Sequence, residues 1–72
     1  MREKIIAIMA DVFEMHANEF PTEITQGNIE NWDSLRHLNL IVELEEAFDK
    51  SFEPEEIGEM TSMDKIIQLI EK

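Results

Sequence analysis

The run from Ser34 to Phe48 has apolar residues on two sides of a helix, and this constrains the fold more than any other stretch. At about 100° per residue, one side forms a stripe suited to a protein core. This core stripe consists of Leu40, Ile41, Leu44, Ala47 and Phe48. A second stripe lies well over a quarter-turn away and consists of Leu35, Leu38 and Val42. A small helical protein needs only one apolar side, so the second stripe requires its own explanation.

Two interpretations of the second stripe are open at this stage. In the first, its three side chains pack on the preceding loop or on a short later helix. In the second, they form an exposed apolar strip with an acidic rim that receives a partner protein or a ligand chain. Ser34 lies at the N-terminal edge of the strip, and Glu45 and Glu46 lie beyond its other end.

Three residues of the same run are predicted to lie on its solvent side, where they either are inert or help to select partners. These residues are Arg36, Asn39 and Glu43. His37 falls near the core stripe and is expected to be half-buried with its hydrogen bonds satisfied. His16 ends the apolar stripe of the first helix, and we expect the same of it.

Periodicity predicts three further helices. Lys4 to His16 repeats apolar residues at helical spacing without Gly or Pro. A short helix runs from Glu53 to about Gly58 or Glu59, with Pro54 in its first turn, and the last helix runs from about Ser62 to Glu71 after a capping-box-like Thr61–Asp64 sequence. We therefore predict an all-α fold, a small four-helix bundle with three main helices and one short third helix, in a single domain over residues 1–72.

A long connection from Ala17 to Asp33 separates the first two helices. Its Pro and Gly residues argue against a regular helix, although a single helical turn fits near Pro21–Ile24. Large apolar residues spaced along it are expected to pin it onto the core, and these are Phe20, Ile24, Ile29 and Trp32. Asp33 is a suitable N-cap for the helix that follows.

The charge balance limits the kinds of partner. The chain has 17 Asp and Glu residues against 6 Lys and Arg, a formal net charge of −11. Nucleic acids and anionic membranes require cations on the protein, so we expect neither as a partner. Basic patches on other proteins are the complementary surfaces.

No apolar run approaches the roughly 20 residues that cross a bilayer, and the chain has no cysteine. We expect a monomeric cytoplasmic protein, and Met1, so close to the first helix, favours an independent chain.

The residues offer little for catalysis or metal binding. Two histidines among scattered acids show no metal-ligand spacing, and the pattern of a calcium loop is missing. Ser34 has no Gly-x-Ser-x-Gly turn around it, and a chain this short cannot enclose a water-excluded site. A phosphodiester on Ser34 would, however, meet the free N–H groups and positive end of its helix.

The run around Ser34 resembles the acyl carrier protein family. The resemblance begins with Asp33-Ser34-Leu35 and continues through Leu38, Leu40, Ile41, Leu44, Glu45, Glu46 and Phe48. The later Phe52, Glu53, Glu56, Ile57, the Met60-Thr61 turn and the final isoleucine-rich helix also match the family layout, as do the long loop, the length and the acidity. The resemblance therefore covers nearly the whole chain.

Several expectations follow from this resemblance. It implies a four-helix bundle of acyl-carrier type with a 4′-phosphopantetheine arm on Ser34, added from coenzyme A by a phosphopantetheinyl transferase with Mg²⁺. The arm would hold acyl groups as thioesters for enzymes of fatty-acid, lipid, polysaccharide or secondary-metabolite synthesis, so the protein itself would not be an enzyme. Asp33 and Leu35 would help the transferase to recognise the serine. The partner-facing helix would present Leu38, Val42, Glu45 and Glu46 to basic patches on acyl-loading and acyl-using enzymes.

The sequence also departs from the family pattern at three positions. Carriers of fatty-acid synthesis usually have acids where Arg36 and Asn39 stand, and a small or aliphatic residue where Trp32 stands. Trp-Asp-Ser-Leu is more similar to stand-alone carriers of specialised pathways. An aminoacyl carrier of the D-alanyl type stays open, as does an acidic helical adaptor that binds basic proteins without an arm.

Overall fold

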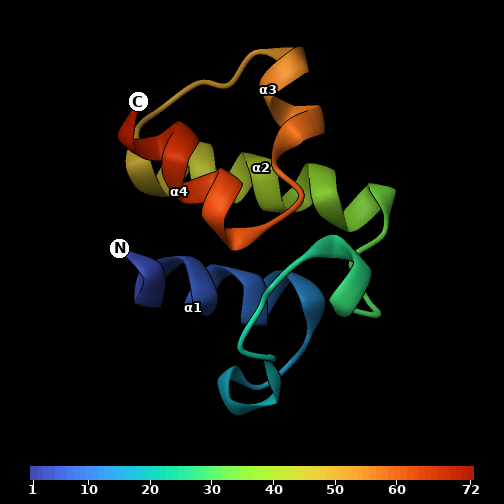
Figure 1. Cartoon of the computed structure of the whole chain (residues 1–72). Helices are drawn as coiled ribbons and strands as arrows, with labels where there is room; N and C mark the ends of the chain where they lie inside the picture. The colour runs from blue at the N-terminus through green and yellow to red at the C-terminus, as the bar shows by residue number, and fades with distance from the viewer.

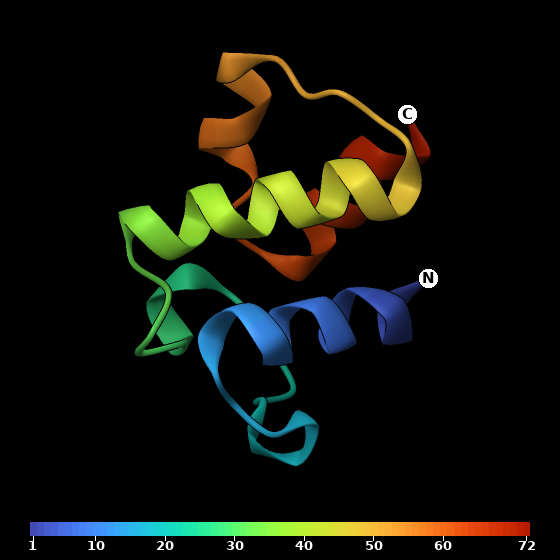
Figure 2. The ribbon, with the colours of Figure 1, turned by 180° about the vertical axis from the view of Figure 1, so that it is seen from behind.

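Four helices form where the apolar residues recur at helical spacing. In the computed structural model, which describes residues 1–72, they are α1 (Arg2–Phe13), α2 (Ser34–Phe48), α3 (Pro54–Glu59) and α4 (Met63–Glu71). α1 and α2 lie side by side and run in opposite directions, while the short α3 lies on the side of α2 away from α1 (Figure 1, Figure 2). The prediction of a small all-α fold with three main helices and a short third helix is confirmed.

The core consists entirely of apolar side chains. α1, α2 and α4 each contribute three of the 13 buried residues, and the segments between the helices contribute the rest. The buried residues of α2 are Leu40, Ile41 and Leu44, with Ala47 and Phe48 half-buried beside them, so the predicted core stripe is confirmed. No polar or charged side chain is buried, and burial of apolar surface therefore stabilises the bundle without the desolvation of a charge.

The long connection between α1 and α2 is pinned onto this core as predicted. Ile24, Ile29 and Trp32 are buried and Phe20 is half-buried. Two backbone hydrogen bonds also join the loop to the start of α4, from Gln26 N to the Thr61 carbonyl at 2.8 Å and from Met63 N to the Ile24 carbonyl at 2.9 Å. The helical turn expected at Pro21–Ile24 is wrong, because short 3-10 turns form instead at Ala17–Glu19 and Gln26–Asn28.

Two predicted helix boundaries need correction. α1 ends at Phe13 rather than His16, because Glu14 adopts a left-handed conformation (φ 55°) and its N–H bonds to the Ala10 carbonyl. His16 therefore lies outside the apolar stripe and is exposed, so the expectation of a half-buried histidine there is wrong. At α4 the cap is Ser62 rather than Thr61, since the Ser62 hydroxyl accepts from Lys65 N at 3.2 Å.

Three of the few cations bind the carbonyl ends of helices. The Lys4 ammonium donates to the Ala47 carbonyl at 3.1 Å and lies 5.0 Å from the centre of the Phe48 ring, at the end of α2. The Arg36 guanidinium reaches the Val12 carbonyl near the end of α1, and Lys50 reaches the Lys72 carbonyl after α4, both at 3.3 Å. Positive charge is favourable there because the last carbonyls of a helix are unpaired and carry partial negative charge.

The acidic side chains are left largely without partners. Only two ion pairs form, Arg36 with Glu14 at 3.3 Å and Lys72 with Glu56 at 3.1 Å, although the chain has 17 acids. Mutual repulsion among the remaining carboxylates therefore opposes the compact state. No helix in the structure combines the length and apolar character that a membrane span requires.

We predict that added salt stabilises the fold. Raising the ionic strength, or adding Mg²⁺, screens the repulsion among the unpaired carboxylates, so the melting temperature should rise. Thermal unfolding followed by circular dichroism at low salt, high salt and millimolar Mg²⁺ measures this effect. A melting temperature that falls or stays level would show that the clustered acids do not limit stability.

Candidate functional site

The start of α2 is held in place by a buried tryptophan. Trp32 is only 3% exposed, and its ring centre lies 5.2 Å from that of Phe13 in α1. The next residue, Asp33, accepts a hydrogen bond from Arg36 N at 2.8 Å and so caps the helix as predicted. Ser34 follows as the first residue of α2 and is exposed. An anchored, capped helix start thus presents a serine hydroxyl to solvent.

The second apolar stripe of α2 lies at the surface. Leu35 is 70% exposed, Leu38 55% and Val42 52%, and the only other large exposed apolar residue is Met1. The interpretation in which these side chains pack on the loop or on α3 is therefore wrong for this structure. They form an exposed strip along one face of α2, beginning beside Ser34. We call Leu35, Leu38 and Val42 the apolar strip below.

The acidic rim of the strip is smaller than predicted. Glu46 and Glu43 are exposed, but the Glu45 carboxylate is half-buried and accepts from Phe52 N at 2.9 Å. Glu45 therefore fastens the segment between α2 and α3 to the end of α2, a contact that its place on the helix surface did not predict. Of the two acids expected to meet a partner, Glu46 is free in this structure.

The expectation that Arg36 lies on the solvent side is also wrong. Its side chain is 30% exposed, and the guanidinium turns back to α1, where it meets Glu14 and the Val12 carbonyl. The cause is the proximity of the antiparallel α1, whose terminal carbonyls attract a cation. Asn39 is exposed as predicted. The strip is consequently bordered by neutral and acidic side chains, with its nearest cation engaged elsewhere.

His37 is half-buried and fully hydrogen-bonded, as predicted. The Trp32 indole N–H donates to His37 Nδ1 at 2.9 Å, and Nε2 lies 2.7 Å from the Ile57 carbonyl oxygen of α3. The two rings are also stacked, with centres 6.0 Å apart. The helical position of His37 predicted its burial, whereas its partners come from other segments and were missed because periodicity along one helix carries no information about them.

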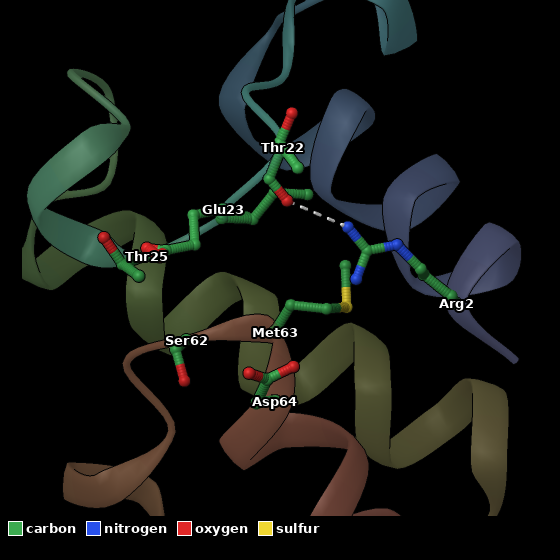
Figure 3. A pocket seen from close by; sticks show the side chains of 8 residues that line it. Arg2, Thr22, Glu23, Thr25, Ser62, Met63 and Asp64 are labelled. Atoms are coloured by element: carbon green, nitrogen blue, oxygen red, sulfur yellow. Dashed lines mark hydrogen bonds between the residues drawn. The ribbon is translucent and has the colours of Figure 1, made fainter.

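The cavities of the structure lie away from Ser34. The larger, of about 290 Å³, lies between the start of α1, the loop and the start of α4. Its lining is mostly polar, and the Arg2 guanidinium donates to the Thr22 carbonyl at 3.3 Å, whereas the Glu23 side chain points toward Thr25 (Figure 3). The smaller cavity, of about 230 Å³, lies beside Lys50 and Lys72. The structure contains no cluster of His, Asp and Glu side chains that could hold a metal ion.

A scan against protein-family models finds no match, and a search of curated proteins finds no relative.

We predict that Asp33 contributes to stability through its cap. Asp33→Ala removes the acceptor for Arg36 N and should lower the free energy of unfolding by about 1 kcal/mol. Asp33→Asn keeps an acceptor oxygen and should lose clearly less. Urea unfolding of the three proteins measures the differences. Equal stability of Asp33→Ala and the unaltered protein would show that this hydrogen bond contributes nothing.

Proposed function

We propose that this protein is an acyl carrier whose attachment residue is Ser34. The observation that carries the proposal is the pairing of an exposed serine at a capped helix start with an exposed apolar strip along the same helix. A serine with a purely structural role has no need of three exposed apolar neighbours, which cost solvation free energy at the surface. The family resemblance of the sequence supports the same assignment.

The residues around Ser34 are compatible with a 4′-phosphopantetheine group joined through a phosphodiester. The Ser34 side chain is exposed, so an attached group can extend into solvent without displacing the core. Asp33 occupies the N–H of Arg36 but not those of Ser34 and Leu35, and the helix N-terminus favours negative charge. When bound, the arm supplies a terminal thiol that holds acyl groups as thioesters. A chain without cysteine offers no competing thiol.

The surface beside Ser34 favours basic client proteins. The apolar strip gives a partner a dry contact, and exposed Glu43 and Glu46 lie on the same helix. Arg36 does not offset this acidity, because Glu14 already neutralises it. The net charge of −11 steers partners with basic patches toward the carrier. We propose a phosphopantetheinyl transferase and acyl-loading and acyl-using enzymes as those partners.

The decisive experiment measures addition of the arm. The protein is incubated with coenzyme A, Mg²⁺ and a broad-specificity phosphopantetheinyl transferase, and its intact mass is recorded. We expect the mass of one phosphopantetheine to be added to the unaltered protein and none to Ser34→Ala. A second carrier of proven competence is treated in parallel to verify the transferase.

An unchanged mass, with the parallel carrier labelled, would overturn the proposal. The remaining candidate would then be an adaptor that uses the apolar strip to bind a basic protein without an arm. Its signature would be equal binding of the same client by Ser34→Ala and by the unaltered protein.

We further predict that the apolar strip contributes to recognition and not to stability. Leu38→Ser should slow arm addition at subsaturating carrier several-fold, because the transferase loses an apolar contact at its interface. The melting temperature should change little, since Leu38 is more than half exposed. Ala7→Ser, an apolar-to-serine change at an exposed site on α1, is the matched control. Equal rates for both variants would exclude the strip from recognition.

A further inference from the structure

The hydrogen bonds of His37 determine where its proton is. The Ile57 carbonyl can only accept, so Nε2, 2.7 Å away, must carry a hydrogen. The Trp32 indole N–H can only donate, so Nδ1, 2.9 Å away, must be free of one. The two contacts together require a neutral imidazole in the Nε2–H form. The ring then joins the segment before Ser34 to α3.

Protonation is incompatible with one end of this bridge. A proton taken up from water by Nδ1 would set an imidazolium N–H against the indole N–H at 2.9 Å, and neither group can accept. The ring or the indole must then move. Trp32 is buried, so loss of this bond leaves the indole N–H without its partner, which costs free energy. The bond to the Ile57 carbonyl does not oppose protonation, because Nε2 is a donor in both forms.

We propose that His37 is a proton-operated switch for the start of α2: the neutral ring holds Trp32, and protonation releases it. Trp32 directly precedes Asp33, which caps α2, and Ser34, its first residue. While Nδ1 carries no proton the bridge is intact, and a proton on Nδ1 breaks its bond to the indole. The switch is a property of the fold and does not depend on the attachment of an arm to Ser34.

The charged residues close in sequence to Phe13, Trp32, His37 and Ile57 do not provide an alternative switch. They are Glu14 after α1, Glu30 and Asp33 of the loop, Arg36 of α2, and Glu53, Glu55, Glu56 and Glu59 in or beside α3. None forms an ion pair with the imidazole. The backbone N–H of Glu53, followed by the Lys72 ammonium, lowers the pKa of Glu56, so this carboxylate stays ionised at pH 5 and above. We therefore assign the switch to the imidazole and not to these carboxylates.

The chain provides its own reporter and its own control. Trp32 is the only tryptophan, so the fluorescence of the protein reports on the indole that His37 binds. His16 is the second histidine, and it is exposed and outside the bridge. His37→Gln removes the titrating ring but keeps one acceptor and one donor group, whereas His16→Gln removes the other histidine alone.

The test follows tryptophan emission and indole N–H exchange from pH 8 to pH 5. In the unaltered protein, in His16→Gln and in Ser34→Ala, we expect the tryptophan emission to change. We also expect the protection factor of the indole N–H to fall about fivefold, a change that corresponds to the loss of one hydrogen bond. In His37→Gln we expect neither. The absence of a transition in the unaltered protein, or its persistence in His37→Gln, would overturn the proposal.

A measurement on the unaltered protein guards against a variant that fails to fold. Nitrogen NMR of the histidine ring at pH 8 distinguishes the two neutral forms. We expect His37 to carry its hydrogen on Nε2, as the Ile57 contact requires. A hydrogen on Nδ1 would contradict the bridge, whatever the behaviour of His37→Gln. Because Ser34→Ala retains the switch, its result separates this inference from the proposal of a carrier arm.

Discussion

The burial of Trp32 is the contact on which the candidate site depends. Its ring packs on Phe13 of α1 and binds His37 of α2, and its carbonyl accepts from the Gln26 side chain at 3.3 Å. The residue before it is fastened too, because the Asn31 amide donates to the Phe13 carbonyl at 2.9 Å. The end of a long loop is therefore fixed on several sides. A defined helix start follows, and Ser34 is presented at a constant place beside the apolar strip.

The few cations of the chain are used in contacts between segments, and most of the acids are left without an ion-pair partner. Lys4, Arg36 and Lys50 each cross from one segment to the carbonyl end of a helix formed by another segment. Their positive charge thus stabilises the tertiary arrangement and is no longer free at the surface. The outer surface is left strongly acidic, with two ion pairs in all. Mutual repulsion among these acids opposes the compact state.

Much of the fold follows from helical periodicity, because a small bundle has only one core in which its apolar stripes can be buried. The stripes of α2 and α4 point to one core, and Pro54 and Asp33 mark helix starts for local steric and hydrogen-bonding reasons. The end of α1 was mispredicted for the opposite reason. Glu14 takes a left-handed conformation that most side chains avoid, and no glycine marks it in the sequence. Its carboxylate is paired there with Arg36, which comes from another helix.

The sequence by itself determined the helices, the apolar core, the acidic character and the two-sided nature of α2, because these depend on residue type and spacing within single segments. The tertiary structure decided which surface residues are free. Leu35, Leu38 and Val42 are exposed because neither the loop nor α3 covers them, whereas Arg36 and Glu45 are engaged because α1 and Phe52 lie within reach. It also decided that His37 bridges Trp32 and Ile57. Such contacts depend on distances between segments remote in the chain, and helical periodicity contains no measure of those distances.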